Sequence, residues 1–298
     1  MKVAQFETEQ ESYIGIELNG RWVNYSKAEA AYHLLERGIA IARPSTIAGL
    51  LADGHFDIAV IKKALNFVKK NRLERHLLIG NTAVMKAPIQ RPPKIVALGL
   101  NYVLHAKEGN FQVPTEPIIF VKVGSSVVGP GETVRIPRGL GRMDHEVELA
   151  VVIGKRATKV KKKDACNYIA GYCICNDVSA RDLQTKDLEK RHPWFRSKSF
   201  DTFTPLGPWI VTADELPPPI HLDLECRVNG KLRQKANTRD LVFDIPTIIE
   251  FITKYITLEP GDVISTGTPG GIGPITHGDT MACRIDRIGE LKNPVRFR

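Results

Sequence analysis

The first ninety residues carry a mixed pattern of hydrophobic and polar positions. "YIGIELNGRWVNYS", residues 13–26, alternates on both sides of Asn19-Gly20, which predicts two strands joined by a tight turn. Residues 27–39 and 57–74 instead repeat apolar positions at helical spacing. "PIQRPPKI", residues 88–95, then interrupts regular structure with three prolines. We therefore expect a small α+β domain over residues 1–90.

Short alternating stretches dominate the rest of the chain. "HLDLECRVNG", residues 221–230, is typical, and turns such as "GPGE", "EPGD" and "TPGG" separate one stretch from the next. One helix is predicted at "DIPTIIEFITKYI", residues 244–256, with Asp244 as its capping residue near Pro246. Strands thus outnumber helices, so we expect an α+β fold that is mostly β, with a second domain over residues 91–298.

Two glutamates interrupt an otherwise apolar strand. In "DHEVELAVVIG", residues 144–154, Glu146 and Glu148 lie on one face, because side chains alternate along a strand, whereas Val147 and Leu149 lie on the other. Carboxylates spaced about 7 Å apart on a partly buried face repel each other. Water, basic side chains or a divalent cation could offset this repulsion.

A third acid follows another apolar stretch. Asp177 ends the apolar part of "GYCICNDVSARDLQ", residues 171–184, and Ser179-Ala-Arg-Asp182 has the form of a helix capping box. With Glu146 and Glu148 it would form an all-oxygen triad, which suits Mg²⁺, Mn²⁺ or Ca²⁺ better than zinc. Taken alone, the pattern is weak evidence, since most E-x-E pairs lie on solvated strand faces.

Composition narrows the classes of partner. The formal net charge is +9, with a dense basic run at Lys159–Lys163, but no zinc finger, basic heptad or aromatic RNA-binding motif accompanies it. We expect a solvated turn there, no nucleic-acid partner, and attraction of a small anionic substrate. The five cysteines form no CxxC pair, and the sequence shows neither a membrane-length apolar run nor a secretory signal. These features predict a cytoplasmic protein without a membrane partner.

Five segments occur along the chain in this order: "GLNYVLHAKE" (99–108), "DHEVELAVVIGK" (144–155), "GYCICNDVSARDLQ" (171–184), "RSKSFDTFTPLGPWIV" (196–211) and "GDVISTGTPGGIG" (261–273). Together they resemble the fumarylacetoacetate hydrolase family, in its shorter branch of acylpyruvate hydrolases, oxaloacetate decarboxylases and hydroxymuconate isomerases. The resemblance covers roughly residues 93–298. It implies a mixed β-sandwich or roll, a homodimer, and Mg²⁺ or Mn²⁺ held by Glu146, Glu148 and Asp177, with Ca²⁺ a further candidate.

The same resemblance implies roles for the residues around the metal. Lys198 would reach the metal-bound oxygens of the substrate, and His105 with Glu108 would activate water from a mobile lid. The implied substrate-binding residues are Tyr102, Arg181, Gln184 and Thr268.

The function expected from the sequence is hydrolytic cleavage of a C–C bond in a small 2-oxo or 1,3-dioxo acid, of the acylpyruvate or fumarylpyruvate type, through an enolate at the metal. The alternative is isomerisation, hydration or decarboxylation of hydroxymuconate-type acids or oxaloacetate on the same site. A non-catalytic metal-binding protein and a nucleic-acid-binding protein are less favoured.

Overall fold

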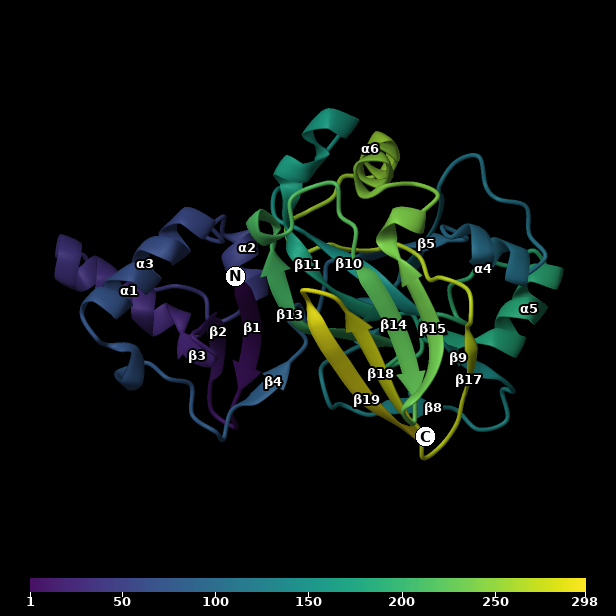
Figure 1. Ribbon diagram of the computed structural model, residues 1–298, viewed down its shortest axis with the longest axis horizontal. Helices are drawn as coiled ribbons and strands as arrows, with labels where there is room; N and C mark the ends of the chain where they lie inside the picture. Colours follow the sequence, from purple (N-terminus) through teal and green to yellow (C-terminus); the bar gives the residue numbers. More distant parts are fainter.

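A computed structural model describes residues 1–298 of the chain, and one large sheet runs through it (Figure 1). Its main path runs in the order β3 (Arg21–Asn24), β2 (Ser12–Leu18), β1 (Lys2–Glu7), β13 (Thr204–Thr212), β11 (Ile169–Asn176), β10 (Val147–Ile153), β16 (Val263–Ser265), β5 (Ile95–Gly99) and β6 (Ile118–Lys122). Two further strands extend this sheet: β4 (Val84–Lys86) pairs with β1, and β7 (Val127–Val128) pairs with β13.

Two smaller sheets complete the β structure. The five-stranded sheet has the order β15 (Lys231–Asn237), β14 (Asp223–Val228), β18 (Thr280–Ile285), β19 (Gly289–Phe297) and β8 (Val134–Ile136). The three-stranded sheet has the order β12 (Ser179–Ala180), β9 (Met143–His145) and β17 (Gly273–Ile275). In Figure 1 strands β14, β15, β18 and β19 form a layer in front of β10 and β11. The predicted α+β fold, mostly β, is confirmed.

The helices lie around the sheets, three of them in the first ninety residues. They are α1 (Tyr25–Arg37), α2 (Ile47–Ala52), α3 (Ile58–Lys70), α4 (Val103–Glu108), α5 (Arg181–Glu189) and α6 (Ile245–Tyr255). Short 3₁₀ helices occupy Glu74–His76, Gly124–Ser126, Lys162–Tyr168, Ala213–Glu215 and Thr238–Asp240. None of the helices is both long and apolar enough to cross a membrane.

Local signals explain several of these boundaries. The hairpin β2–β3 turns at Asn19-Gly20, where both residues have positive φ, as predicted. Helix α6 begins after Asp244, whose carboxylate accepts the backbone N–H of Thr247 at 2.9 Å, so the predicted cap is confirmed. The predicted capping box at Ser179 is wrong. Ser179 pairs with Asp144 in the small sheet, and α5 begins two residues later without a side-chain cap.

The alternation along β10 divides the interior into two cores. Val147, Leu149, Val151 and Ile153 pack in one core with residues of β14, β18 and α6. Ala150 and Val152 face the other way, into a second core that contains residues of the N-terminal strands and of α2 and α3. One strand therefore contributes to both layers, and its acidic face belongs to the side opposite Val147.

The N-terminal unit is joined to the rest by sheet and core. Strand β1 pairs antiparallel with β13, with Val3 opposite Ile210. Leu50 of α2 is fully buried in the second core, which also holds Val152 and Cys173. The boundary at residue 90 stays a prediction as a division between domains, while the backbone pairing makes one continuous sheet across it.

This shared core predicts one unfolding transition for the whole chain. Leu50→Ala should lower the free energy of unfolding by about 2–5 kcal/mol, because it leaves a cavity between α2 and the sheet. The matched control is Leu35→Ala, since Leu35 is 68% exposed on α1. Chemical denaturation followed by tryptophan fluorescence and by far-UV circular dichroism provides the measurement. Two separated transitions, with only the first shifted by Leu50→Ala, would show that the N-terminal unit unfolds on its own.

Candidate metal centre and active-site cavity

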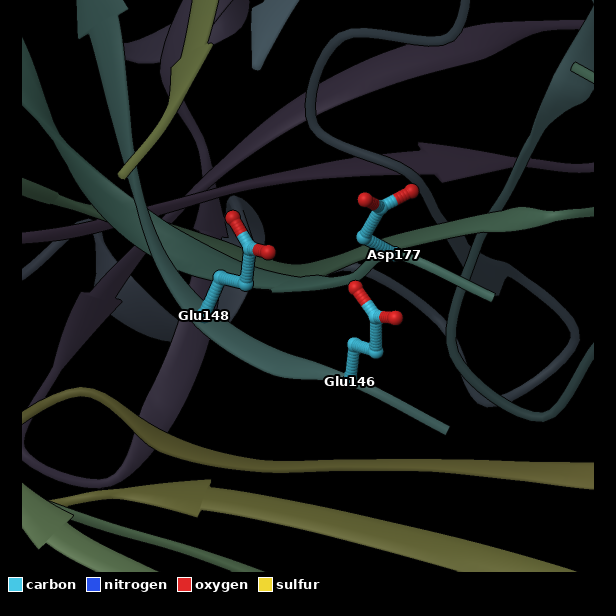
Figure 2. Close-up of side chains that lie close together, drawn as sticks. All are labelled: Glu146, Glu148 and Asp177. Atoms are coloured by element: carbon cyan, nitrogen blue, oxygen red, sulfur yellow. The ribbon is translucent and has the colours of Figure 1, made fainter. Parts of the chain in front are cut away.

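The three predicted acidic side chains converge in the interior. Glu146 lies between β9 and β10, Glu148 lies in β10 opposite Cys175 of β11, and Asp177 follows the end of β11. The Asp177 N–H donates to the Glu146 carbonyl at 2.8 Å, which fixes the two strand ends together. Each residue offers an oxygen that lies within 4.8 Å of the others, and all three are buried. Figure 2 shows their carboxylates gathered around one space.

Basic side chains neutralise two of these carboxylates. The Lys198 ammonium lies 2.7 Å from Glu146 Oε2 and 2.6 Å from Asp177 Oδ2. The Arg181 guanidinium also donates to Glu146. Burial raises the pKa of Glu146, but Lys198 and Arg181 more than offset this and hold it below its ordinary value. Burial lowers the pKa of Lys198, whereas Asp177 and Glu146 raise it, with a net rise. Lys198 is therefore an ammonium.

Glu148 has no such cationic partner. Its Oε2 accepts the hydroxyl of Ser265 at 2.6 Å and the N–H of Gly267 at 2.8 Å. Burial, followed by the nearby Asp177, raises the pKa of Glu148 to about 8. A divalent cation would reverse this effect, because it is attracted to the ionised form. The donor set is all oxygen and lacks cationic compensation at one member, so it fits Mg²⁺, Mn²⁺ or Ca²⁺.

A cavity of about 440 Å³ opens onto this cluster. Most of the predicted site residues line it: His105, Glu108, Glu146, Glu148, Arg181, Gln184, Lys198 and Thr268. Leu98, Phe120 and Trp194 are among its apolar lining residues. Asp177 and Tyr102 do not belong to the lining. Tyr102 is buried at the start of α4, and burial raises the pKa of its hydroxyl, so its substrate contact stays a prediction without geometric support.

Helix α4 brings the predicted lid pair to the cavity. His105 and Glu108 are three residues apart, and 3.7 Å separates His105 Nδ1 from Glu108 Oε2. The Glu108 carboxylate also accepts the Gly271 N–H at 3.1 Å. Burial lowers the pKa of His105, Glu146 opposes this, and Arg181 and Lys198 lower it further, with a net decrease. The imidazole is therefore uncharged at neutral pH, and its role as a base stays a prediction.

The predicted substrate-binding residues already have partners within the protein. Arg181 donates Nε to Asp144 at 2.8 Å, Nη1 to Gln184 and Nη2 to Glu146. The Thr268 hydroxyl donates to the Val147 carbonyl at 3.0 Å. These contacts hold the residues beside the carboxylates, whereas substrate binding by Arg181, Gln184 and Thr268 stays a prediction.

Two buried polar residues were missed by the sequence analysis. Lys122, fully buried at the end of β6, donates to Asp177 Oδ1 at 2.5 Å and to the Phe203 carbonyl at 3.1 Å. Its only sequence signal is a lysine after the apolar run "IIFV". Gln234 donates to Thr268 Oγ1 at 2.8 Å and interacts with His145 Nδ1 at 2.9 Å. Strand β15 is polar along most of its length, so no pattern distinguishes Gln234.

Comparison with known proteins places this fold and cavity in a family. The model of the fumarylacetoacetate (FAA) hydrolase C-terminal family matches residues 94–296. The oxaloacetate tautomerase FAHD2A, mitochondrial, of Homo sapiens is 41% identical over 259 residues, which is 85% of this chain and 80% of the human protein. The chain therefore belongs to the fumarylacetoacetate hydrolase family of enzymes, which confirms the resemblance.

Solved structures agree over the whole length. The 5-carboxymethyl-2-hydroxymuconate delta-isomerase of Mycobacterium smegmatis is 32% identical with a TM-score of 0.74, and the alignment covers 100% of both chains. The maleylpyruvate hydrolase of Sphingobium sp. SYK-6, in complex with manganese(II) ion and pyruvate, is 31% identical with a TM-score of 0.75. That alignment covers 100% of this chain and 99% of the hydrolase. Similar proteins are thus named for tautomerase, isomerase and hydrolase activities.

The uncompensated charge of Glu148 generates a prediction about metal binding. Mn²⁺ at about one hundred times its dissociation constant should stabilise the protein by about 2.7 kcal/mol. Glu148→Gln should abolish most of this gain, because it removes a ligand charge. Thermal denaturation with and without Mn²⁺ measures it, and Glu132→Gln, which alters a carboxylate paired with Lys86, is the control. A variant that keeps the full Mn²⁺-dependent gain would remove Glu148 from the site.

The raised pKa of Glu148 predicts how the stability of the metal-free protein changes with pH. Between pH 4.5, the ordinary pKa of a glutamate, and about pH 8, folded Glu148 keeps a proton that the unfolded chain has lost. This group therefore makes the metal-free protein less stable as pH rises through that range. Without metal, the free energy of unfolding of Glu148→Gln should therefore rise relative to that of the wild type as the pH increases from about 5 to about 8.

Proposed function

We propose that this protein is a divalent-metal-dependent enzyme that interconverts the keto and enol forms of a small 2-oxo dicarboxylic acid of the oxaloacetate type. The observation that carries this proposal is that one cavity contains an uncharged imidazole beside a lysine and members of a buried acid triad. His105, Glu146, Glu148 and Lys198 all line that cavity. Such a site has a base that can accept a proton from carbon and a cation that can stabilise the negative charge on the enolate oxygen.

Each residue would have a distinct task in this reaction. A divalent cation held by Glu146, Glu148 and Asp177 would polarise the keto group of a 2-oxo acid and so acidify the adjacent C–H bond. His105, being uncharged, accepts that proton from carbon. The Lys198 ammonium stabilises the negative charge that develops on the keto oxygen and can supply the proton that completes the enol. Lys122 pairs with Asp177 and Arg181 pairs with Glu146, and these contacts hold the two carboxylates in place.

The comparisons favour isomerisation, which the sequence analysis gave as an alternative, over hydrolysis, which it gave as the first choice. The human relative, whose name is an oxaloacetate tautomerase, is more similar in sequence than the solved isomerase and hydrolase structures. The first choice from sequence, hydrolytic C–C cleavage, therefore becomes the second candidate here. One observation favours it: Glu108 lies 3.7 Å from His105 Nδ1 at the edge of the cavity, and a nearby carboxylate makes an imidazole a better base toward water.

The partners expected from sequence remain proposals. We propose a homodimer, a cytoplasmic location and no nucleic-acid partner. Strand β6 ends the large sheet and exposes Ile118 and Val121 at 38% and 43%, an apolar edge that a second copy could cover. Light scattering on the full chain tests the dimer, and a monomer at micromolar concentration would contradict it.

The role of His105 generates the functional prediction. His105→Ala should lower the rate constant for ketonisation of enol-oxaloacetate by about 10²- to 10⁴-fold, the usual contribution of a general base. Mn²⁺ affinity should stay unchanged, because His105 is not a ligand. Ultraviolet absorbance of the enol and calorimetric Mn²⁺ titration measure these quantities. Lys107→Ala, exposed on the same helix and outside the cavity lining, is the matched control.

Two results would alter the proposal. Wild-type ketonisation by His105→Ala would exclude the imidazole as the base. A wild-type protein that cleaves an acylpyruvate but leaves enol-oxaloacetate at its uncatalysed rate would favour hydrolysis over tautomerisation.

A further inference from the structure

Two arginines line the cavity, and their contacts differ. Each side-chain nitrogen of Arg181 donates to a protein acceptor, namely Asp144, Gln184 or Glu146. Arg142 uses only Nε, which donates to Asp144 Oδ1 at 2.6 Å. Its Nη1 and Nη2 have no acceptor within the protein, and its side chain is 46% exposed. Arg142 therefore has donors left for a bound molecule.

The position of Arg142 is fixed from several sides. Its backbone N–H donates to Asp182 Oδ2 at 3.1 Å, and its carbonyl accepts the Arg181 N–H at 2.8 Å. Gly141, just before it, has a φ of +82°, and a Cβ there would lie 2.0 Å from Asp182 Oδ2. The loop before β9 is thus closely packed on the start of α5, so Arg142 projects from an anchored backbone.

A line of ionic contacts leads from the triad to Arg142. Glu146 contacts Arg181, Arg181 contacts Asp144 Oδ2, and Asp144 Oδ1 contacts Arg142. The exposed fraction of the two arginine side chains rises along this line, from 20% in Arg181 to 46% in Arg142. Arg181 thus contacts the carboxylate triad directly, whereas Arg142 is linked to it only through Asp144 and Arg181 and is more exposed to solvent.

We infer that Arg142 binds the distal carboxylate of the substrate and so selects 2-oxo dicarboxylic acids over 2-oxo monocarboxylic acids. This inference rests on the proposed function, in which the 2-oxo acid end of the substrate lies at the triad. A guanidinium with two neighbouring donors matches the two oxygens of a carboxylate. The other cations of the lining do not offer this, because Lys198 already contacts two carboxylates and Arg181 contacts three acceptors.

The test compares two acids of the same chain length. Oxaloacetate carries the distal carboxylate, and 2-oxobutanoate has a methyl group in its place. Enzyme-dependent exchange of the C3 protons with deuterium, followed by NMR with Mg²⁺ present, gives kcat/KM for each. Arg142→Gln should lower kcat/KM for oxaloacetate by about tenfold to hundredfold, mainly through KM, and change that for 2-oxobutanoate less than about twofold.

Two further variants separate charge from geometry and from surface effects. Arg142→Lys keeps the charge but lacks the planar pair of donors, so its kcat/KM for oxaloacetate should lie between those of Arg142→Gln and the wild type. Arg156→Gln removes an exposed arginine that pairs with Glu259 outside the cavity lining. It should leave kcat/KM unchanged for both acids.

Equal losses for both acids in Arg142→Gln, or no loss for oxaloacetate, would overturn the inference. If the wild type exchanges neither acid, the proposed function fails, and calorimetric binding of both acids to the Mn²⁺-loaded protein still tests Arg142. Weaker binding of oxaloacetate alone in Arg142→Gln would then support the inference, and unchanged binding would refute it.

Discussion

Three buried carboxylates on neighbouring strands create the charge that the centre of this structure must balance. Removing ionised groups from water is costly unless they are paired, and like charges at this separation oppose one another. Lys198 bridges Glu146 and Asp177. Lys122 contacts the other carboxylate oxygen of Asp177, and Arg181 contacts Glu146. Only Glu148 depends on neutral donors. This asymmetry is the strongest physical reason for a divalent cation.

The fold supplies the rigidity that such a cluster needs. Strand β10 packs one face into the core shared with β14, β18 and α6, which leaves its other face for the acids near one end and for Ala150 and Val152 farther along. Strands β11 and β16 flank it, so the positions of Asp177 and Ser265 follow from backbone pairing. The loops that complete the cavity are then attached at fixed points, such as Gly271 on Glu108.

Much of this arrangement could be predicted from sequence because it follows from short-range rules. Alternation placed Glu146 and Glu148 on one face, Asn19-Gly20 marked a hairpin, and Asp244 marked a helix start. Family motifs then identified eight of the 19 residues that line the cavity. The capping-box prediction failed because Ser179 pairs in a small sheet and donates its hydroxyl to Glu146, a long-range contact that local spacing does not reveal. Lys122, Gln234 and the union of β1 with β13 depend on tertiary packing in the same way.

The most direct test of the central claim is a crystal structure of the protein grown with Mn²⁺, with anomalous diffraction used to locate the metal. The charge balance described here predicts a single strong peak bounded by the carboxylates of Glu146, Glu148 and Asp177. A fully occupied peak elsewhere, or no peak among these carboxylates at saturating Mn²⁺ with Lys198 still bridging two of them, would contradict it.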